Sequence, residues 1–161
     1  MRVDEEHFRA LVRAHGTDLL RMCFLYLGDR QLAEDAVQET FWKAFRAMDK
    51  FREESDVGTW LTRIAINTCK NMRRAPWSRI RPTDQLPEVG MSDRYADETV
   101  AREVMRLPRR ERECVILYYQ REMRADEVAR VLGITRDAVY NRLKRARVRL
   151  KVRLEGWYFD E

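Results

Sequence analysis

The sequence has few residues that interrupt helices and no long hydrophobic run. Among 161 residues there are six glycines and four prolines, and no convincing strand pattern. This composition predicts an all-α protein and excludes a sheet-based fold. No apolar stretch approaches the length of a membrane span, and the acids Asp4, Glu5 and Glu6 argue against a signal peptide. We therefore expect a cytoplasmic protein without direct membrane insertion.

Cysteine and histidine are also scarce. Cys23, Cys69 and Cys114 are odd in number and each falls within an apolar helical pattern, which predicts buried reduced thiols. His7 and His15 have no carboxylate or thiol at ligand spacing, so we expect surface or capping histidines and no metal site. The sequence shows no phosphate-binding loop and no nucleophile with a base. It therefore predicts no enzyme, cofactor or small-molecule substrate.

Positive charge is concentrated in the last third of the chain. The formal net charge is +5, to which residues 1–74 contribute +1, residues 75–98 contribute −2 and residues 99–161 contribute +6. This distribution indicates a polyanionic partner for the C-terminal region.

The stretch from Ala125 to Arg153 predicts a helix-turn-helix. Gly133 suits a backbone of positive φ after a first helix, and Thr135 can cap a second helix that begins near Arg136. That second helix carries eight basic residues against one acid, whereas a solvated amphipathic helix usually mixes both signs. Such a helix is typical of one that enters the major groove of DNA. A repressor or activator with a helical sensor or dimerisation domain is the main alternative.

Helical patterns also cover the N-terminal half. Apolar faces on either side of residues 15–17 predict two helical segments before Gly28, and a further helix runs from about Gln31 to Met48. The expected buried stripe of this further helix comprises Leu32, Ala36, Val37, Phe41, Ala44, Phe45 and Met48. Its opposite face begins with carboxylates, which either favour the helix dipole or dock a partner.

Residues 51–58 predict a surface loop, and a helix with a mixed surface follows from Thr59. Trp60 begins its apolar stripe, while its other side chains are basic or amide. Rings stack on bases, amides read base edges and cations hold the backbone, so this helix suits unpaired bases. A tryptophan at helical spacing is more often part of a buried core.

Residues 76–98 predict a flexible acidic linker with proline, between one domain at 1–75 and another at 99–161. The second domain resumes with a helix to Leu107 and another after Pro108. The residues expected to pack this second helix beneath the helix-turn-helix are Val115, Ile116, Tyr118 and Tyr119. The aromatic tail at 157–159 either packs on the last helix or binds a partner.

Three stretches give the chain a family resemblance. They are EDAVQETFWKAFRAMDKF, TWLTRIAINTCKN, and LPRRERECVILYY followed by the helix-turn-helix through NRLKRAR. In this order, with the linker between the second and third, the chain resembles the extracytoplasmic-function sigma factors, the two-domain members of the bacterial primary sigma superfamily. The resemblance spans about Phe8 to Leu150.

The resemblance implies that the first domain docks on the clamp helices of core RNA polymerase through Asp35, Gln38 and Glu39. It also implies that this domain opens the −10 element and captures a flipped base, with Asn67 at the position of the family's amide. The expected −10 residues are Ser55, Asp56, Trp60, Arg63, Asn67, Lys70 and Asn71. The linker then threads the polymerase cleft, where its acidity suits either an RNA mimic or a solvated tether.

For the second domain the resemblance implies recognition of the −35 element and packing on the polymerase flap. The expected DNA-reading residues are Arg136, Tyr140, Asn141, Lys144 and Arg145, while Arg142, Arg147 and Arg149 hold phosphates or the core helix.

The second domain also departs from the family pattern. Asp137 stands where the family has a small residue and Tyr140 where it has Lys or Arg, so the −35 sequence of relatives is not carried over. Arg124 replaces a usual Ser or Thr cap. An anti-sigma factor, often membrane-anchored in this family, is an expected partner that no residue identifies.

Overall fold

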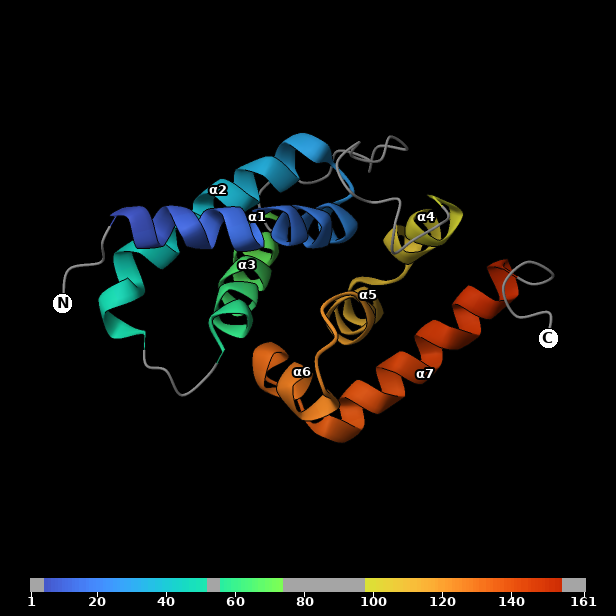
Figure 1. Cartoon of the computed structure of the whole chain (residues 1–161). Coiled ribbons are helices and arrows are strands. Elements are labelled where there is room, and N and C mark those ends of the chain that lie inside the picture. Colours follow the sequence, from blue (N-terminus) through green and yellow to red (C-terminus); the bar gives the residue numbers. More distant parts are fainter. Residues whose placement is uncertain (1–4, 52–55, 74–97, 155–161) are drawn as a thin grey trace. The chain divides into compact units, whose positions relative to one another are not determined.

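The computed structural model describes residues 5–51, 56–73 and 98–154, and within these ranges it contains seven α-helices and no strand (Figure 1). The chain divides into two compact units, residues 1–91 and 92–161. The all-α prediction is confirmed. The expected linker at 76–98 lies almost wholly outside the described residues, so its bounds stay a prediction, as does the placement of the aromatic tail.

Three helices form the first unit: α1 (Glu5–Leu27), α2 (Arg30–Ala47) and α3 (Val57–Arg73), with a 3₁₀ turn η1 (Met48–Lys50) after α2. Each helix contacts the other two. Small buried residues on α2, including Ala33, Ala36 and Ala44, allow its neighbours to approach closely. Large side chains such as Phe24 and Tyr26 of α1 fill the rest of the core.

The α1 helix is continuous, although the sequence predicts a break at residues 15–17. Gly16 lies within the helix, where a Cβ atom would be 4.0 Å from the Phe41 ring on α2. A mid-helix glycine costs only about 1 kcal/mol relative to alanine, and packing of a long buried face readily offsets that amount. The predicted two segments are therefore one helix.

The second unit contains α4 (Glu98–Arg106), α5 (Arg109–Val115), the π-helical turn η3 (Ile116–Gln120), α6 (Ala125–Leu132) and α7 (Arg136–Arg153). The α7 helix packs on α4, α5 and α6. Val139, Leu143 and Ala146 form its fully buried stripe. A core of apolar side chains thus holds the most basic helix of the chain in place.

The turn between α6 and α7 has the predicted chemistry. Gly133 has a φ of 69°, in the left-handed region, and the N–H of Ile134 donates to the carbonyl of Ala129 at 3.0 Å. Thr135 caps α7 by accepting from the N–H of Ala138 at 3.1 Å. The predicted helix-turn-helix, with its second helix starting at Arg136, is confirmed.

The start of α6 compensates for its missing Ser or Thr cap. The Glu127 carboxylate accepts from the backbone N–H of Arg124 at 3.3 Å and from the guanidinium of Arg124 at 3.1 Å. This is the glutamate half of a capping box, supplemented by an ion pair. Arg124 and Arg130 flank Asp126. Desolvation raises the pKa of the Asp126 carboxyl, but these two cations and backbone N–H groups together outweigh it, so the pKa is lowered.

Candidate nucleic-acid interface

Four arginines of α7 are engaged by the rest of the second unit. Arg149 Nε lies 2.9 Å from Glu111 Oε2 on α5, and Arg153 Nε lies 3.5 Å from Glu103 Oε2 on α4. Both carboxylates are buried, so each needs a cationic partner to offset its desolvation. These two pairs attach the C-terminal half of α7 to the helices beneath it.

The other two engaged arginines meet polar side chains of α5 and η3. Arg147 Nε donates to the Tyr119 hydroxyl at 2.7 Å, and its guanidinium lies 5.6 Å from the centre of that ring. Arg142 hydrogen-bonds to the buried Cys114 thiol. Burial raises the pKa of Cys114 from 9.0 to about 11 against the opposing charge of Arg142, so this thiol stays protonated near neutral pH.

The position of Tyr119 differs from the predicted one. The tyrosine is 48% exposed and packs against Arg147 and Tyr118, instead of lying beneath the helix-turn-helix. Arg142, Arg147 and Arg149 each make a contact within the second unit.

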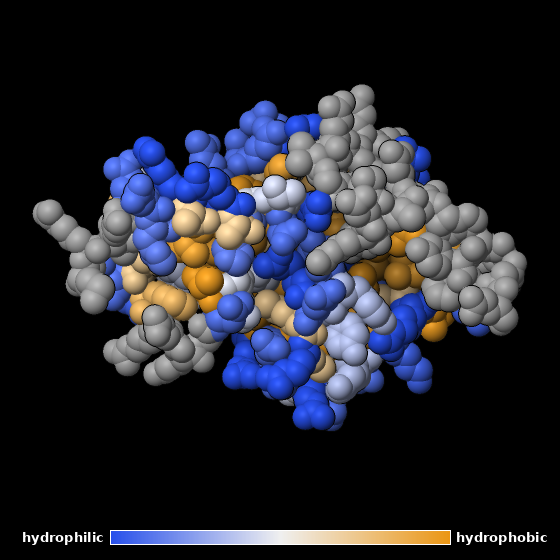
Figure 2. All heavy atoms as spheres, in the orientation of Figure 1, coloured by the Kyte–Doolittle hydropathy of each residue, from blue (hydrophilic) through white to orange (hydrophobic). Residues whose placement is uncertain are grey.

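The predicted −35 residues lie together on the outward face of α7. The set comprises Arg136, Tyr140, Asn141, Lys144 and Arg145, all of which are exposed. None of them makes a hydrogen bond or ion pair with another described residue, which leaves three cations, one amide and one phenol available. In Figure 2, hydrophilic side chains gather over α6 and the adjoining start of α7.

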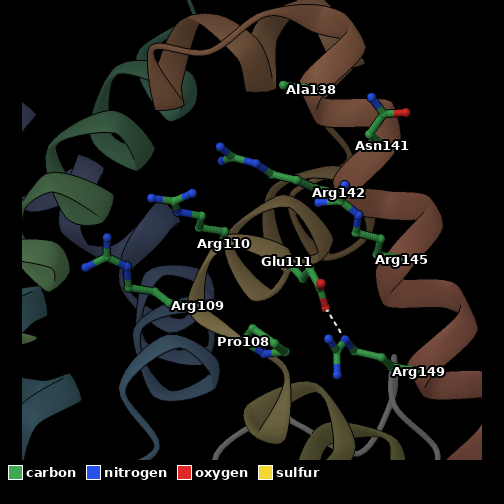
Figure 3. Close-up of a pocket in the computed structure, with 9 residues that line it drawn as sticks. All are labelled: Pro108, Arg109, Arg110, Glu111, Ala138, Asn141, Arg142, Arg145 and Arg149. Carbon is green, nitrogen blue, oxygen red and sulfur yellow. Dashed lines mark ion pairs between the residues drawn. The ribbon is translucent and has the colours of Figure 1, made fainter.

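Arg145 and Asn141 also border a basic groove between α7 and the start of α5. The groove has a volume of about 520 Å³ (Figure 3). Its lining comprises Pro108, Arg109, Arg110, Glu111, Ala138, Asn141, Arg142, Arg145 and Arg149. Glu111 is the single acid among five arginines of this lining, and it is paired with Arg149. The groove therefore extends the positive surface of α7 onto α5, which sequence patterns alone did not indicate.

In the first unit, the described −10 residues lie along α3 and at its start. Arg63, Asn67 and Asn71 are exposed, whereas Lys70 is half-buried and makes a contact of its own. Trp60 is half-buried, and its ring centre lies 4.8 Å from that of Phe51. An exposed amide and arginine surface thus follows Trp60 on α3, and the Phe51 ring before this helix packs against Trp60 at a tilt of 38°.

The structure begins α3 at Val57, two residues earlier than the sequence pattern predicts. Gly58 is buried there: a Cβ atom would lie 2.9 Å from Asp56 Oδ2 and 3.4 Å from His15 Cε1. The Asp56 carbonyl accepts from the N–H of Trp60 at 3.0 Å. Asp56 is therefore exposed directly before the helix, while Ser55 lies outside the described residues.

The predicted docking residues form part of a stripe on α2. Asp35, Gln38 and Glu39 are exposed, and Asp35 accepts from the Gln31 amide at 3.1 Å. The stripe continues into two aromatic side chains, Trp42 at 56% exposed and Phe45 at 44% exposed. Phe45 was predicted to be buried; it instead packs edge-on against Phe8 at 5.1 Å with one side in solvent.

The described residues contain no cluster of three or more His, Cys, Asp or Glu side chains placed to hold a metal ion. None of the helices in the described ranges combines the length and apolar character needed to span a bilayer. Cys23, Cys69 and Cys114 are buried thiols, as predicted.

Comparisons with known proteins identify the family. Residues 11–79 match the model for Sigma-70 region 2, and residues 97–150 match the model for Sigma-70, region 4. The ECF RNA polymerase sigma factor SigM of Mycobacterium tuberculosis is 36% identical over 96% of this chain and 80% of its own length. The chain belongs to the extracytoplasmic-function sigma factors. It is thus a regulatory transcription initiation factor that binds core RNA polymerase and promoter DNA.

Further relatives agree with this sigma-factor assignment. The ECF sigma factor SigW of Bacillus subtilis is 27% identical over 94% of this chain and 90% of its own. The solved structure of CnrH, in complex with the cytosolic domain of CnrY, has a TM-score of 0.73 at 28% identity and covers 95% of this chain and 90% of that one. The sigma factor RpoE of Bartonella quintana shares the fold, with a TM-score of 0.77 at 22% identity over 94% and 98% of the two chains.

Proposed function

We propose that the outward face of α7 reads the −35 element while the arginines paired within the second unit hold the helix in place. The observation that supports this division is the pairing of the cations. Arg142, Arg147, Arg149 and Arg153 are engaged by the second unit, whereas Arg136, Lys144 and Arg145 have no partner among the described residues. A major-groove helix needs its base-reading and phosphate-binding groups free of such internal partners.

Tyr140 and Asp137 give this reading face its own specificity. Tyr140 cannot make the bidentate contact by which arginine recognises guanine, and Asp137 can accept from a cytosine amino group. Both side chains are exposed in the first two turns of α7. The preferred −35 sequence therefore differs from that of relatives with a basic residue at position 140.

Recognition of the −10 element belongs, in this proposal, to α3 and the residue before it. Asn67 reads a base flipped from the duplex, Arg63 and Asn71 hold the neighbouring backbone, and Asp56 borders the pocket. The exposure of these four side chains supports the assignment. The proposed set also includes Ser55, Trp60 and Lys70. The Phe51 ring packs against the Trp60 ring.

Docking on the clamp helices of polymerase uses α2. Asp35, Gln38 and Glu39 supply polar contacts, and the adjoining Trp42 supplies an aromatic anchor of the kind that dominates interface energies. Arg46 lies 6.0 Å from the centre of the Trp42 ring and shields part of it in the free protein. In this proposal the second unit contacts the polymerase flap.

An anti-sigma factor is a further proposed partner. Among the similar solved structures, CnrH is in complex with the cytosolic domain of CnrY, and the sigma factor RpoE is in complex with the anti-sigma factor NepR. A comparable partner would cover the polymerase-binding surface of α2 and retain this chain in an inactive complex. We also propose that the chain acts in the cytoplasm and contributes specificity without a catalytic step of its own.

The test is a footprint of holoenzyme reconstituted from core polymerase and this chain, on promoters selected from a random DNA library. We expect two protected elements, with strand opening confined to the downstream one. Substitution of Asn141 by Ala should change base preference only in the upstream element. A change in the downstream element instead would contradict the assignment of α7.

A further inference from the structure

The side chain of His15 on α1 lies against the first turn of α3. The sequence predicts a surface or capping histidine, but this one is half-buried. A Cβ atom on Gly58 would lie 3.4 Å from His15 Cε1 and 3.8 Å from His15 Nδ1. The same atom would lie 2.9 Å from Asp56 Oδ2. An imidazole and a carboxylate from distant parts of the sequence therefore converge on one point beside Gly58.

The absence of a side chain at Gly58 permits this convergence. Gly58 is buried and its φ lies outside the left-handed region, so its backbone conformation does not require glycine. Glycine within a helix costs about 1 kcal/mol relative to alanine. An alanine here, however, would press its Cβ atom on the Asp56 carboxylate. Gly58 thus keeps the space in which His15 and Asp56 approach each other.

Neither of these two polar side chains has an internal partner. Asp56 is exposed, and the side chains of His15 and Asp56 make no hydrogen bond or ion pair with another described residue. Polar groups withdrawn from water are normally hydrogen-bonded in folded proteins. A half-buried imidazole without a partner, next to an exposed carboxylate, therefore indicates a site for a polar ligand.

The pair offers a hydrogen-bond donor beside an acceptor. An imidazole carries at least one N–H in either protonation state, and a carboxylate accepts. Each of the four nucleobases presents a donor beside an acceptor on its Watson–Crick edge, and that edge is free when the base is unpaired. Such a pair therefore distinguishes unpaired bases from paired ones, and it distinguishes one base from another only weakly.

We propose that His15 is a further DNA-contacting residue of the −10 site, and that it binds the edge of one unpaired base together with Asp56. This inference rests on the proposed −10 role of α3, because Asp56 directly precedes that helix. It adds α1 to the −10 surface. The role of His15 is to hold the opened strand, whereas the choice of sequence belongs to other residues.

The test measures binding of holoenzyme to a fork template with a single-stranded −10 non-template strand, from which one base at a time is removed. For the wild type, we expect removal of one particular base to weaken binding about fivefold, the effect of one or two hydrogen bonds. His15→Leu keeps an apolar side chain against Gly58 but lacks the N–H. It should bind intact DNA about fivefold more weakly, and removal of the same base should then cost less than about twofold.

Two further variants separate hydrogen bonding from packing. His15→Gln retains an N–H donor and should restore most of the affinity for intact DNA. His7→Leu changes an exposed histidine of the same helix and should behave as the wild type at every position of the template.

Three outcomes would overturn the inference alone. They are wild-type affinity in His15→Leu, an equal loss in His15→Leu on the intact template and on every template that lacks a base, and failure of His15→Gln to restore binding. The second outcome would give His15 a purely structural role. If instead no base removal weakens binding of the wild-type holoenzyme, the proposed −10 role of α3 fails, and this inference fails with it.

Discussion

Arg149 on α7 and Glu111 on α5 form an ion pair of 2.9 Å that joins the recognition helix to the helix beneath it. The guanidinium is 56% exposed while the carboxylate is 8% exposed, so the arginine covers an otherwise buried negative charge. The pair explains why a helix with so many cations does not offer all of them to DNA. Arg149 is paired within the second unit, whereas Arg136, Lys144 and Arg145 have no partner among the described residues.

The first prediction separates these two classes of cation by salt dependence. Substitution of Lys144 and Arg145 by Ala should weaken −35 binding and lower the slope of log K against log salt by about two, because each phosphate contact contributes about 0.9. Arg147→Ala removes a cation that is bonded to Tyr119, and it should change the slope by less than half as much. Filter binding over a salt series measures both. Equal slopes for the two variants would show that the division is wrong.

The second prediction concerns the stability of the second unit. Glu111→Gln should lower the free energy of unfolding by about 1 kcal/mol, because the buried partner of Arg149 loses its charge while the exposed guanidinium stays solvated. The loss should shrink at high salt. Glu122→Gln is the matched control, since Glu122 is exposed, and it should change stability by less than about 0.5 kcal/mol. Chemical denaturation measures both. An unchanged free energy of unfolding in Glu111→Gln would show that this ion pair does not stabilise the second unit.

The third prediction follows from the raised pKa of Cys114. Burial moves the pKa from 9.0 to about 11, so the folded state keeps its thiol proton at pH values where the unfolded chain loses it. The resulting stability is fully present below pH 9 and declines as pH rises towards about 11. The alkaline fall in unfolding free energy should therefore be shallower in Cys114→Ala than in the wild type. Superimposable pH profiles would show that this thiol ionises equally in both states.

The fourth prediction addresses strand opening. Asn67→Ala should reduce permanganate reactivity of the −10 element more than it reduces closed-complex formation, because the amide acts only on an unpaired base. Thr59→Ala, at a half-buried position of the same helix outside the proposed set, is the control. Equal reductions of closed and open complexes in Asn67→Ala would remove the base-capture role.

Local chemistry made much of the second unit predictable. Gly133 and Thr135 mark a turn and a cap that depend on residues within one turn of helix, and both have the predicted geometry. The sequence also predicts the exposed −35 residues of α7 as a set, because charge and apolar spacing divide that helix into two faces. Periodicity and capping are sufficient wherever neighbouring residues decide the conformation.

Contacts between distant segments were not predictable in the same way. The pairing of Arg149 with Glu111 and of Arg147 with Tyr119 depends on how α7 packs, which no spacing within either segment encodes. The exposure of Phe45 likewise depends on how far α1 covers α2. These contacts decide which cations are structural, so the candidate site became defined only once the helices were packed together.

The central claim is that this chain lends promoter specificity to core RNA polymerase, and the most direct measurement is run-off transcription with purified components. Three reactions are compared on a promoter selected by the holoenzyme: core polymerase alone, core polymerase with this chain, and core polymerase with the Trp42→Ala chain. We predict a discrete transcript only when the chain is present. At limiting concentration, the Trp42→Ala chain should give about tenfold less transcript than the wild type, because it loses an aromatic anchor worth about 1.4 kcal/mol. A chain that binds the promoter duplex alone, and yields no transcript with core polymerase, would contradict the account.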